Sequence, residues 1–161
     1  MQLELTPVKP GLVLVMAGLL FGIWLGVSFG INEDGYKDYI AEGITRHQDL
    51  HDAKSADKIW RYAQRAHFHA TGIAAFSLGL VVLVAGSGMQ RRMKTLSSVL
   101  IGLGGLYPLG WYNMYLNAPV IGRAAAHDHI LTELFTYAGV GGLLVGLAML
   151  LAHLYLGQFG D

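Results

Sequence analysis

The distribution of charge along the chain limits its fold more than any other feature. Four stretches contain no Asp, Glu, Lys, Arg or His, and they lie at residues 10–32, 70–90, 95–122 and 134–152. Each is about as long as the roughly 20-residue helix that crosses the hydrocarbon core of a bilayer. Because these runs are continuously apolar and do not alternate with polar residues, they predict membrane helices and not the strands of a barrel.

We therefore expect an all-α integral membrane protein, folded as an antiparallel bundle of four transmembrane helices in a single domain of residues 1–161. The predicted spans lie at about 11–30, 69–88, 96–116 and 130–155. A cleaved signal peptide is the alternative for the first run. That run is too long for a signal peptide, and it has no small-x-small cleavage site before the charged stretch that follows.

The composition supports a membrane location and excludes several classes of function. Of the 161 residues, 53% are hydrophobic and 14% are charged, whereas a soluble domain carries about 25% charged residues. Eleven basic and eleven acidic residues cancel, so we expect no nucleic-acid partner. Because the chain has no cysteine, disulfides, thiolate zinc sites, iron–sulfur clusters and thioether-linked haem are excluded. A bound metal would need His, Asp, Glu or Met ligands.

The orientation in the membrane is predicted from the basic residues. The turn at 90–94 places three positive charges between spans two and three, which favours a cytoplasmic turn. The segment 31–66 contains six Lys and Arg residues and argues for the opposite orientation, although many acidic residues lie among them. We predict that both termini are cytoplasmic, in a bacterial inner membrane, with segment 31–66 on the extracytoplasmic side.

The segment 31–66 is predicted to be an amphipathic helical insert between spans one and two. Its residues Ile40, Ile44, His47 and His51 are spaced by four, three and four, which places them in one stripe of a helix. Such a helix can lie across the end of the bundle. The residue types around Ser55 predict the start of a second helix that continues into span two.

The histidines are the most informative residues for function. Because successive spans alternate in direction, one face of the membrane receives six of the seven, namely His47, His51, His67, His69, His127 and His129. Ionisable groups at membrane depth are costly and are usually functional. Neutral imidazole binds haem iron, copper, zinc and non-haem iron. We therefore expect at least two of these histidines to bind a metal or haem iron.

One haem b is the leading hypothesis for the cofactor. Residues i and i+2 of a helix point about 200° apart, so one member of each His-x-His pair faces the bundle axis. His67 from span two and His127 from span four, which have small alanine neighbours, are the predicted axial ligands. The haem propionates would then be bound by Arg61, Arg65 and Arg123 at the polar rim of the same face.

A non-haem metal site is the competing hypothesis. Two pairs, His47 with His51 and His129 with Glu133, have the i,i+4 spacing that places ligands on one helix face, and His69 lies near them in the predicted bundle. Pairs of this kind from several helices build di-iron and related centres. Copper, iron or zinc would then be bound in a membrane oxidase or oxygenase, so whether the protein is an enzyme stays open.

Four spans with histidines on the second and fourth resemble the small membrane-anchored b-type cytochromes, including the di-haem quinone-linked kind and the haem-bearing anchors of respiratory dehydrogenases. The resemblance implies electron transfer of the respiratory type, with a quinone or a redox protein as partner. It implies one bis-histidine haem, because only His153 falls at the opposite face. The alternative is a non-catalytic accessory subunit of a larger membrane complex, and either form would associate with other subunits or with further copies of itself.

Overall fold

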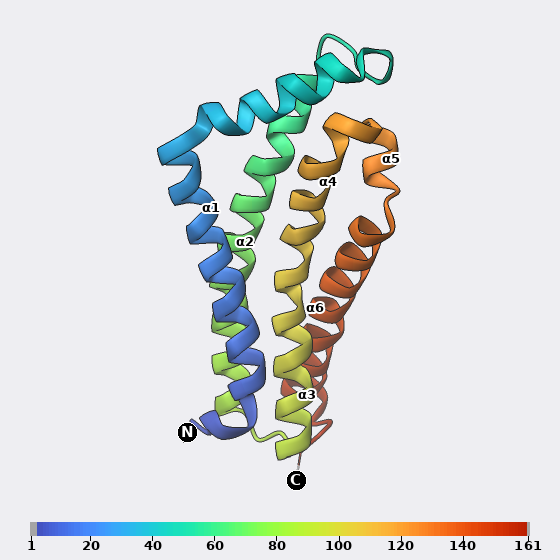
Figure 1. The fold of residues 1–161 in the computed structure, drawn as a ribbon. Coiled ribbons are helices and arrows are strands. Elements are labelled where there is room, and N and C mark those ends of the chain that lie inside the picture. Colours follow the sequence, from blue (N-terminus) through green and yellow to red (C-terminus); the bar gives the residue numbers. More distant parts are fainter. Residues whose placement is uncertain (1–2, 161) are drawn as a thin grey trace.

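The computed structural model describes residues 3–160, and within this range the chain is all-helical. The elements in chain order are α1 (Leu5–Arg46), η1 (Gln48–Leu50), α2 (Ser55–Gly86), α3 (Arg91–Gly102), η2 (Leu103–Leu106), α4 (Tyr107–Ile121), α5 (Arg123–His127) and α6 (Ile130–Leu156). Helix α1 packs against α2 and α3, α2 packs against α4, and α6 packs against α3 and α4. Both chain ends lie at the same end of the bundle (Figure 1).

Three helices are long and apolar enough to cross a membrane, namely α1, α2 and α6. They correspond to the first, second and fourth predicted spans. Their outward faces carry large apolar side chains, among them Val13, Phe76 and Leu144. A helix that is apolar on its outer surface as well as its inner one is expected where the surroundings are lipid.

The third predicted span, 96–116, is not one continuous helix. The 12-residue α3 and the 15-residue α4 run end to end, and the short 3₁₀ segment η2 separates them. Pro108 explains the interruption, because it lacks an N–H and its ring would collide with the carbonyl of Gly104 in a regular helix. The chain therefore tightens into η2 and restarts as α4, where Pro108 lies in the first turn and is tolerated.

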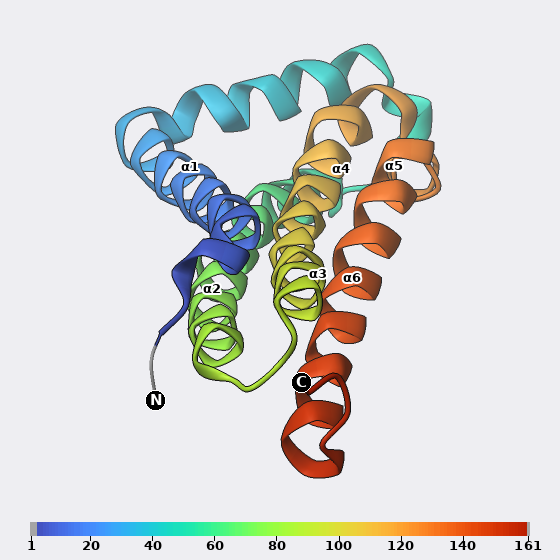
Figure 2. The ribbon, with the colours of Figure 1, turned by 90° about the horizontal axis from the view of Figure 1, so that it is seen from below.

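Helix α1 bends sharply at Asn32, whose φ of −145° and ψ of 47° are not helical. Beyond the bend, residues 33–46 lie across one end of the bundle (Figures 1 and 2). Ile40 from this segment is buried in a cluster with Ile59 and Tyr115, as the predicted apolar stripe requires. Helix α2 begins at Ser55, also as predicted.

Four glycines of α1 that are spaced by four residues form a ridge, whose members Gly22 and Gly26 contact α2; they are Gly18, Gly22, Gly26 and Gly30. A Cβ atom at Gly22 would lie 2.9 Å from the backbone nitrogen of Thr71, and one at Gly26 would lie 2.7 Å from Cε1 of His67. Such distances leave no room for a side chain. Gly30, by contrast, has nothing within 4 Å of its Cβ position. Gly22 and Gly26 therefore allow close helix packing, whereas Gly30, the last glycine of the ridge, has no neighbour at its Cβ position.

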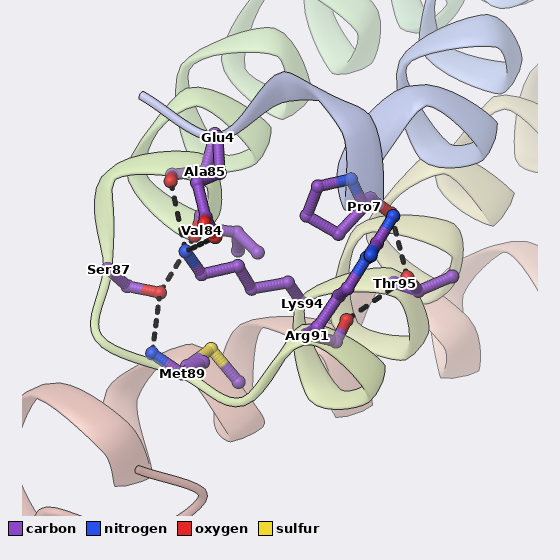
Figure 3. A network of polar contacts seen from close by, with 9 residues as sticks. All are labelled: Glu4, Pro7, Val84, Ala85, Ser87, Met89, Arg91, Lys94 and Thr95. Atoms are coloured by element: carbon purple, nitrogen blue, oxygen red, sulfur yellow. Dashed lines mark hydrogen bonds and ion pairs between the residues drawn. The ribbon is translucent and has the colours of Figure 1, made fainter. Parts of the chain in front are cut away.

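A buried lysine holds the N-terminal segment against the turn between α2 and α3 (Figure 3). Lys94 is only 4% exposed, and its Nζ donates to Glu4 Oε2 at 2.8 Å and to the carbonyl of Ala85 at 3.3 Å. The Thr95 hydroxyl donates to the carbonyl of Pro7 at 2.8 Å. A buried ammonium group is stable only with such partners. The ion pair therefore fixes where α1 begins.

The first prediction concerns the α1–α2 contact. Gly22→Ala should lower the free energy of unfolding by about 1–3 kcal/mol, because the added methyl group forces two closely packed backbones apart. The matched control is Gly72→Ala on α2, where the Cβ position is open and a better helix former should be neutral or slightly stabilising. Thermal unfolding followed by circular dichroism in detergent measures both. Equal effects of the two substitutions would contradict this account of the contact.

The second prediction concerns the pH dependence of the N-terminal contact. The hydrogen bond from Lys94, together with its charge, holds the pKa of Glu4 below its ordinary value of 4.5. A carboxyl group with a lowered pKa stabilises the fold above its ordinary pKa, and the contribution is lost as the pH falls through the lowered value. Wild type should therefore unfold at a higher temperature than Glu4→Gln at neutral pH, and the difference should shrink in acid. Glu42→Gln, which removes an exposed pair with Arg46, should show a much smaller difference.

Candidate histidine site

The histidines occupy two levels of one half of the bundle. His47 follows α1, His51 follows η1, and His127 and His129 flank the short connection from α5 to α6. His67 lies deeper, about 18 Å along α2 from its first residue at a rise of 1.5 Å per residue. The end of the bundle that carries residues 33–46 therefore gathers these side chains.

His67 is held by a hydrogen bond to the neighbouring helix. Its Nδ1 lies 2.8 Å from the carbonyl oxygen of Gly22 on α1. Because a carbonyl only accepts hydrogen bonds, Nδ1 carries the ring proton and donates it. The second ring nitrogen, Nε2, therefore carries a free lone pair, and no hydrogen-bond partner reaches it from residues 3–160. The ring rests on Gly26, where no side chain could be accommodated.

His69 points to the opposite side of α2, as two residues of a helix two positions apart must. Its ring is stacked on Trp111 at 5.9 Å and meets the edge of Tyr107 at 5.0 Å, both on α4. The structure thus separates the two members of the first His-x-His pair. His67 contacts α1, and His69 belongs to an aromatic contact between α2 and α4.

The second pair is also divided between two roles. His129 is the N-cap of α6, and its Nδ1 accepts the backbone N–H of Leu131 at 3.2 Å. His127 is exposed, and its Nδ1 lies 3.0 Å from Oδ1 of Asp128. The contacts of His67 and His127 involve different elements, so the structure does not bring these two predicted axial ligands together.

The predicted non-haem ligands are dispersed as well. His51 Nε2 bonds to the carbonyl of Pro119 at 3.1 Å, which ties the insert to α4. The prediction that His47 and His51 share a helix stripe is wrong, because α1 ends at Arg46 and the chain turns through η1 before His51. The Nδ1 of His129 is occupied by its capping bond. Glu133 is exposed on the first turn of α6. Among the residues that the structure describes, no three His, Asp or Glu side chains gather in a group that could hold a metal ion.

The three predicted propionate ligands have different surroundings. The guanidinium of Arg65 lies 4.7 Å above the ring of Trp111 in a cation–π contact. Arg123 Nη2 pairs with Asp52 Oδ2 at 3.2 Å. Arg61 is exposed, and within residues 3–160 it forms neither an ion pair nor a ring contact. Of the three, Arg61 is therefore the one that is free to bind an anionic group.

Sequence reasoning missed Asp52, which organises the loop before α2. Its Oδ1 accepts the Ser55 hydroxyl at 3.0 Å and the Lys54 backbone N–H at 2.9 Å, while its backbone N–H donates to Ser55 Oγ at 3.0 Å. The same carboxylate pairs with Arg123 of α5. An Asp side chain that accepts the backbone N–H two residues later forms an Asx turn, a motif for which Asp is favoured. The sequence does not indicate that Asp52 pairs with Arg123 of α5.

Sequence reasoning also missed a pocket between α4 and α6. It has a volume of about 270 Å³, and its lining includes Tyr107, Trp111, His127, Glu133 and Tyr137. Two of the predicted site residues, His127 and Glu133, therefore share one pocket although neither contacts His67. The spacing of four between Tyr107 and Trp111, and again between Glu133 and Tyr137, was a signal for two facing stripes.

Comparison with known proteins adds no further information about this site. No family model, no curated protein and no solved structure matches the chain. The chemistry that the site can support is therefore decided by its own geometry. That geometry comprises His67, whose Nδ1 donates to a carbonyl and whose Nε2 has no partner among residues 3–160, one unpaired arginine on the same helix, and a separate pocket between α4 and α6. His51 and His153 also bond to a carbonyl through one ring nitrogen.

The third prediction concerns Asp52. Hydrogen bonds from the Ser55 hydroxyl and the Lys54 backbone hold the pKa of Asp52 below its ordinary value, so the carboxylate stays charged at neutral pH. Asp52→Ala should loosen the loop 47–54 and raise its amide hydrogen-exchange rates several-fold at neutral pH, because local opening becomes easier. Asp49→Ala, an exposed acid in the same loop, is the control and should leave these rates unchanged. Unchanged rates in both variants would contradict the role given to Asp52.

Proposed function

We propose that this protein is an integral membrane protein that binds one haem b through His67 and takes part in electron transfer of the respiratory type. In this proposal α1, α2, the path α3–η2–α4 and α6 each cross the bilayer, as a bundle of four antiparallel spans. The basic turn with Arg91, Arg92 and Lys94 lies at the end that also carries both termini, which supports a cytoplasmic location for that end. The histidines would then lie on the extracytoplasmic side of a bacterial inner membrane.

The observation that carries the haem proposal is the hydrogen bond between His67 and Gly22. Histidines that bind metals nearly always donate their other ring N–H to a carbonyl or a carboxylate, which fixes the tautomer and the direction of the ring. His67 has this arrangement, with Nδ1 donating at 2.8 Å and Nε2 free. Of the other members of the two His-x-His pairs, His69 stacks on Trp111 and His129 caps α6. His127 is exposed, with its Nδ1 at the carboxylate of Asp128.

The surroundings of His67 fit a flat cofactor at the flank of the α1–α2 contact. The continuation of the glycine ridge at Gly30 is open, and Ala75, two turns along α2 from His67, is exposed. Arg61 lies on α2 toward the polar end and supplies a cation for a propionate. A porphyrin ring could therefore lie against small residues while its acidic groups reach the membrane surface.

The proposal assigns His67 alone to the iron, because His127 does not face it. A bound haem would supply a one-electron redox centre. Its potential would depend on the axial ligand and on burial. Other membrane subunits, or further copies of this chain, would cover the outward side of a group held on this flank. A quinone or a redox protein would exchange electrons with it.

The non-haem alternative has less support. A copper, iron or zinc centre needs three or more ligands at one point. The pocket between α4 and α6 brings together His127 and Glu133, which is one ligand short of a minimal set. His129 and His51 do not line this pocket.

The fourth prediction tests the haem proposal. The purified protein, reconstituted with haem in detergent, should show a Soret band that shifts on reduction, and His67→Ala should abolish that band or reduce it at least tenfold. The control is His47→Ala, which removes a histidine from the same end of the bundle without touching His67. Circular dichroism of each variant separates loss of ligand from loss of fold. Absence of a Soret band in wild type, or an unchanged band in folded His67→Ala, would overturn the proposal.

A further inference from the structure

The pocket between α4 and α6 has the properties of a small-molecule site. Its volume of about 270 Å³ is slightly below the range of roughly 300–1,000 Å³ that is usual for ligand pockets. Tyr107 and Trp111 form two walls whose ring planes meet at 81°, with centroids 6.2 Å apart. Met114 extends the apolar lining. These walls fit one ring with a short apolar substituent.

The residues that line the pocket carry polar groups on α6, at the end of α5 and on α4, where the Nε1 of Trp111 is buried without a hydrogen-bond partner among residues 3–160. Thr132 Oγ1 has two protein partners, because it accepts from Asn113 at 2.8 Å and donates to the carbonyl of Ala126 at 2.8 Å. Glu133, in contrast, has no ion pair or hydrogen bond to its side chain from residues 3–160. A carboxylate only accepts hydrogen bonds. An occupant that satisfies it must therefore present a donor.

Charge near the pocket distinguishes a neutral donor from an ammonium group. The guanidinium of Arg65 lies 4.7 Å above the ring of Trp111, so a second cation against that ring would meet a like charge and a partly used π face. Glu133 in turn repels anions. A neutral hydroxyl group provides the required donor, and it is repelled neither by the Arg65 cation nor by the Glu133 carboxylate. Tyr137, at the edge of the pocket, is 72% exposed on the apolar surface of α6, which gives access from the bilayer.

We propose that this pocket binds a neutral, lipid-soluble ring compound with a hydroxyl group, which is the chemistry of phenols and hydroquinones. The hydroxyl donates to Glu133, and the ring lies against Tyr107, Trp111 and Met114. The pocket contains no contact to His67, so this site is independent of the proposed haem. It gives the protein a binding site for a membrane-dissolved small molecule at the same end of the bundle as the histidines.

The fifth prediction tests this site with 4-propylphenol as the probe. The protein is labelled with 5-fluorotryptophan, which gives fluorine NMR signals for its three tryptophans, assigned by Trp→Phe variants. The phenol should shift the Trp111 signal in a saturable manner and leave Trp24 and Trp60 unchanged. Propylbenzene, which lacks the hydroxyl, should bind about tenfold more weakly, because a hydrogen bond to a charged group is lost.

Variants complete the test. Glu133→Ala should weaken phenol binding about tenfold, whereas Glu33→Ala, an exposed acid on the insert, should not change it. His67→Ala should bind the phenol as wild type does, which separates this site from the haem proposal. Equal shifts with propylphenol and propylbenzene, similar shifts of all three tryptophans, or an unchanged affinity in folded Glu133→Ala would each overturn the inference. Tighter binding of benzylamine than of the phenol would do so as well.

Discussion

The contact between α1 and α2 is the interaction on which the rest of the structure depends. Glycine at positions 22 and 26 lets the two helices approach until an imidazole ring fits between them and reaches a backbone carbonyl. In a membrane, where apolar burial does not drive helices together, close van der Waals contact and interhelical hydrogen bonds supply the association. The same contact fixes the tautomer of His67. Packing and the candidate chemistry thus share one interaction.

At the polar end of the bundle, water competes with the protein for every hydrogen bond. There the insert is held by several weak contacts that act together, including the bond from His51 to Pro119 and the pair of Asp52 with Arg123. Exposed ion pairs contribute little one by one. The burial of Ile40 against Ile59 and Tyr115 is therefore what places this helix, and the polar contacts set its orientation.

Much of the fold followed from the sequence, because long charge-free runs and the period of Ile40 and Ile44 are local signals. The break before Pro108 was foreseeable as a distortion, although its form, a 3₁₀ segment, depends on packing against α1 and α6. The candidate site was less predictable. The clustering of histidines at one end follows from topology, but which nitrogen each ring uses depends on backbone groups distant in sequence. The spacing and composition of the sequence do not indicate that the carbonyl of Gly22 bonds to His67, or that Arg123 pairs with Asp52.

The bond network around Lys94 has a consequence for how the chain assembles as it is synthesised. Helices α1 and α2 can pair once residue 86 has left the ribosome, but the partner of Glu4 is incorporated later. The carbonyl of Phe159, which accepts the backbone N–H of Gln90 at 2.8 Å, comes last of all. The first turn of α1 therefore gains its partners only after α3 has been synthesised. The contact between α1 and α2 is available to the chain before the bonds that close this end of the bundle.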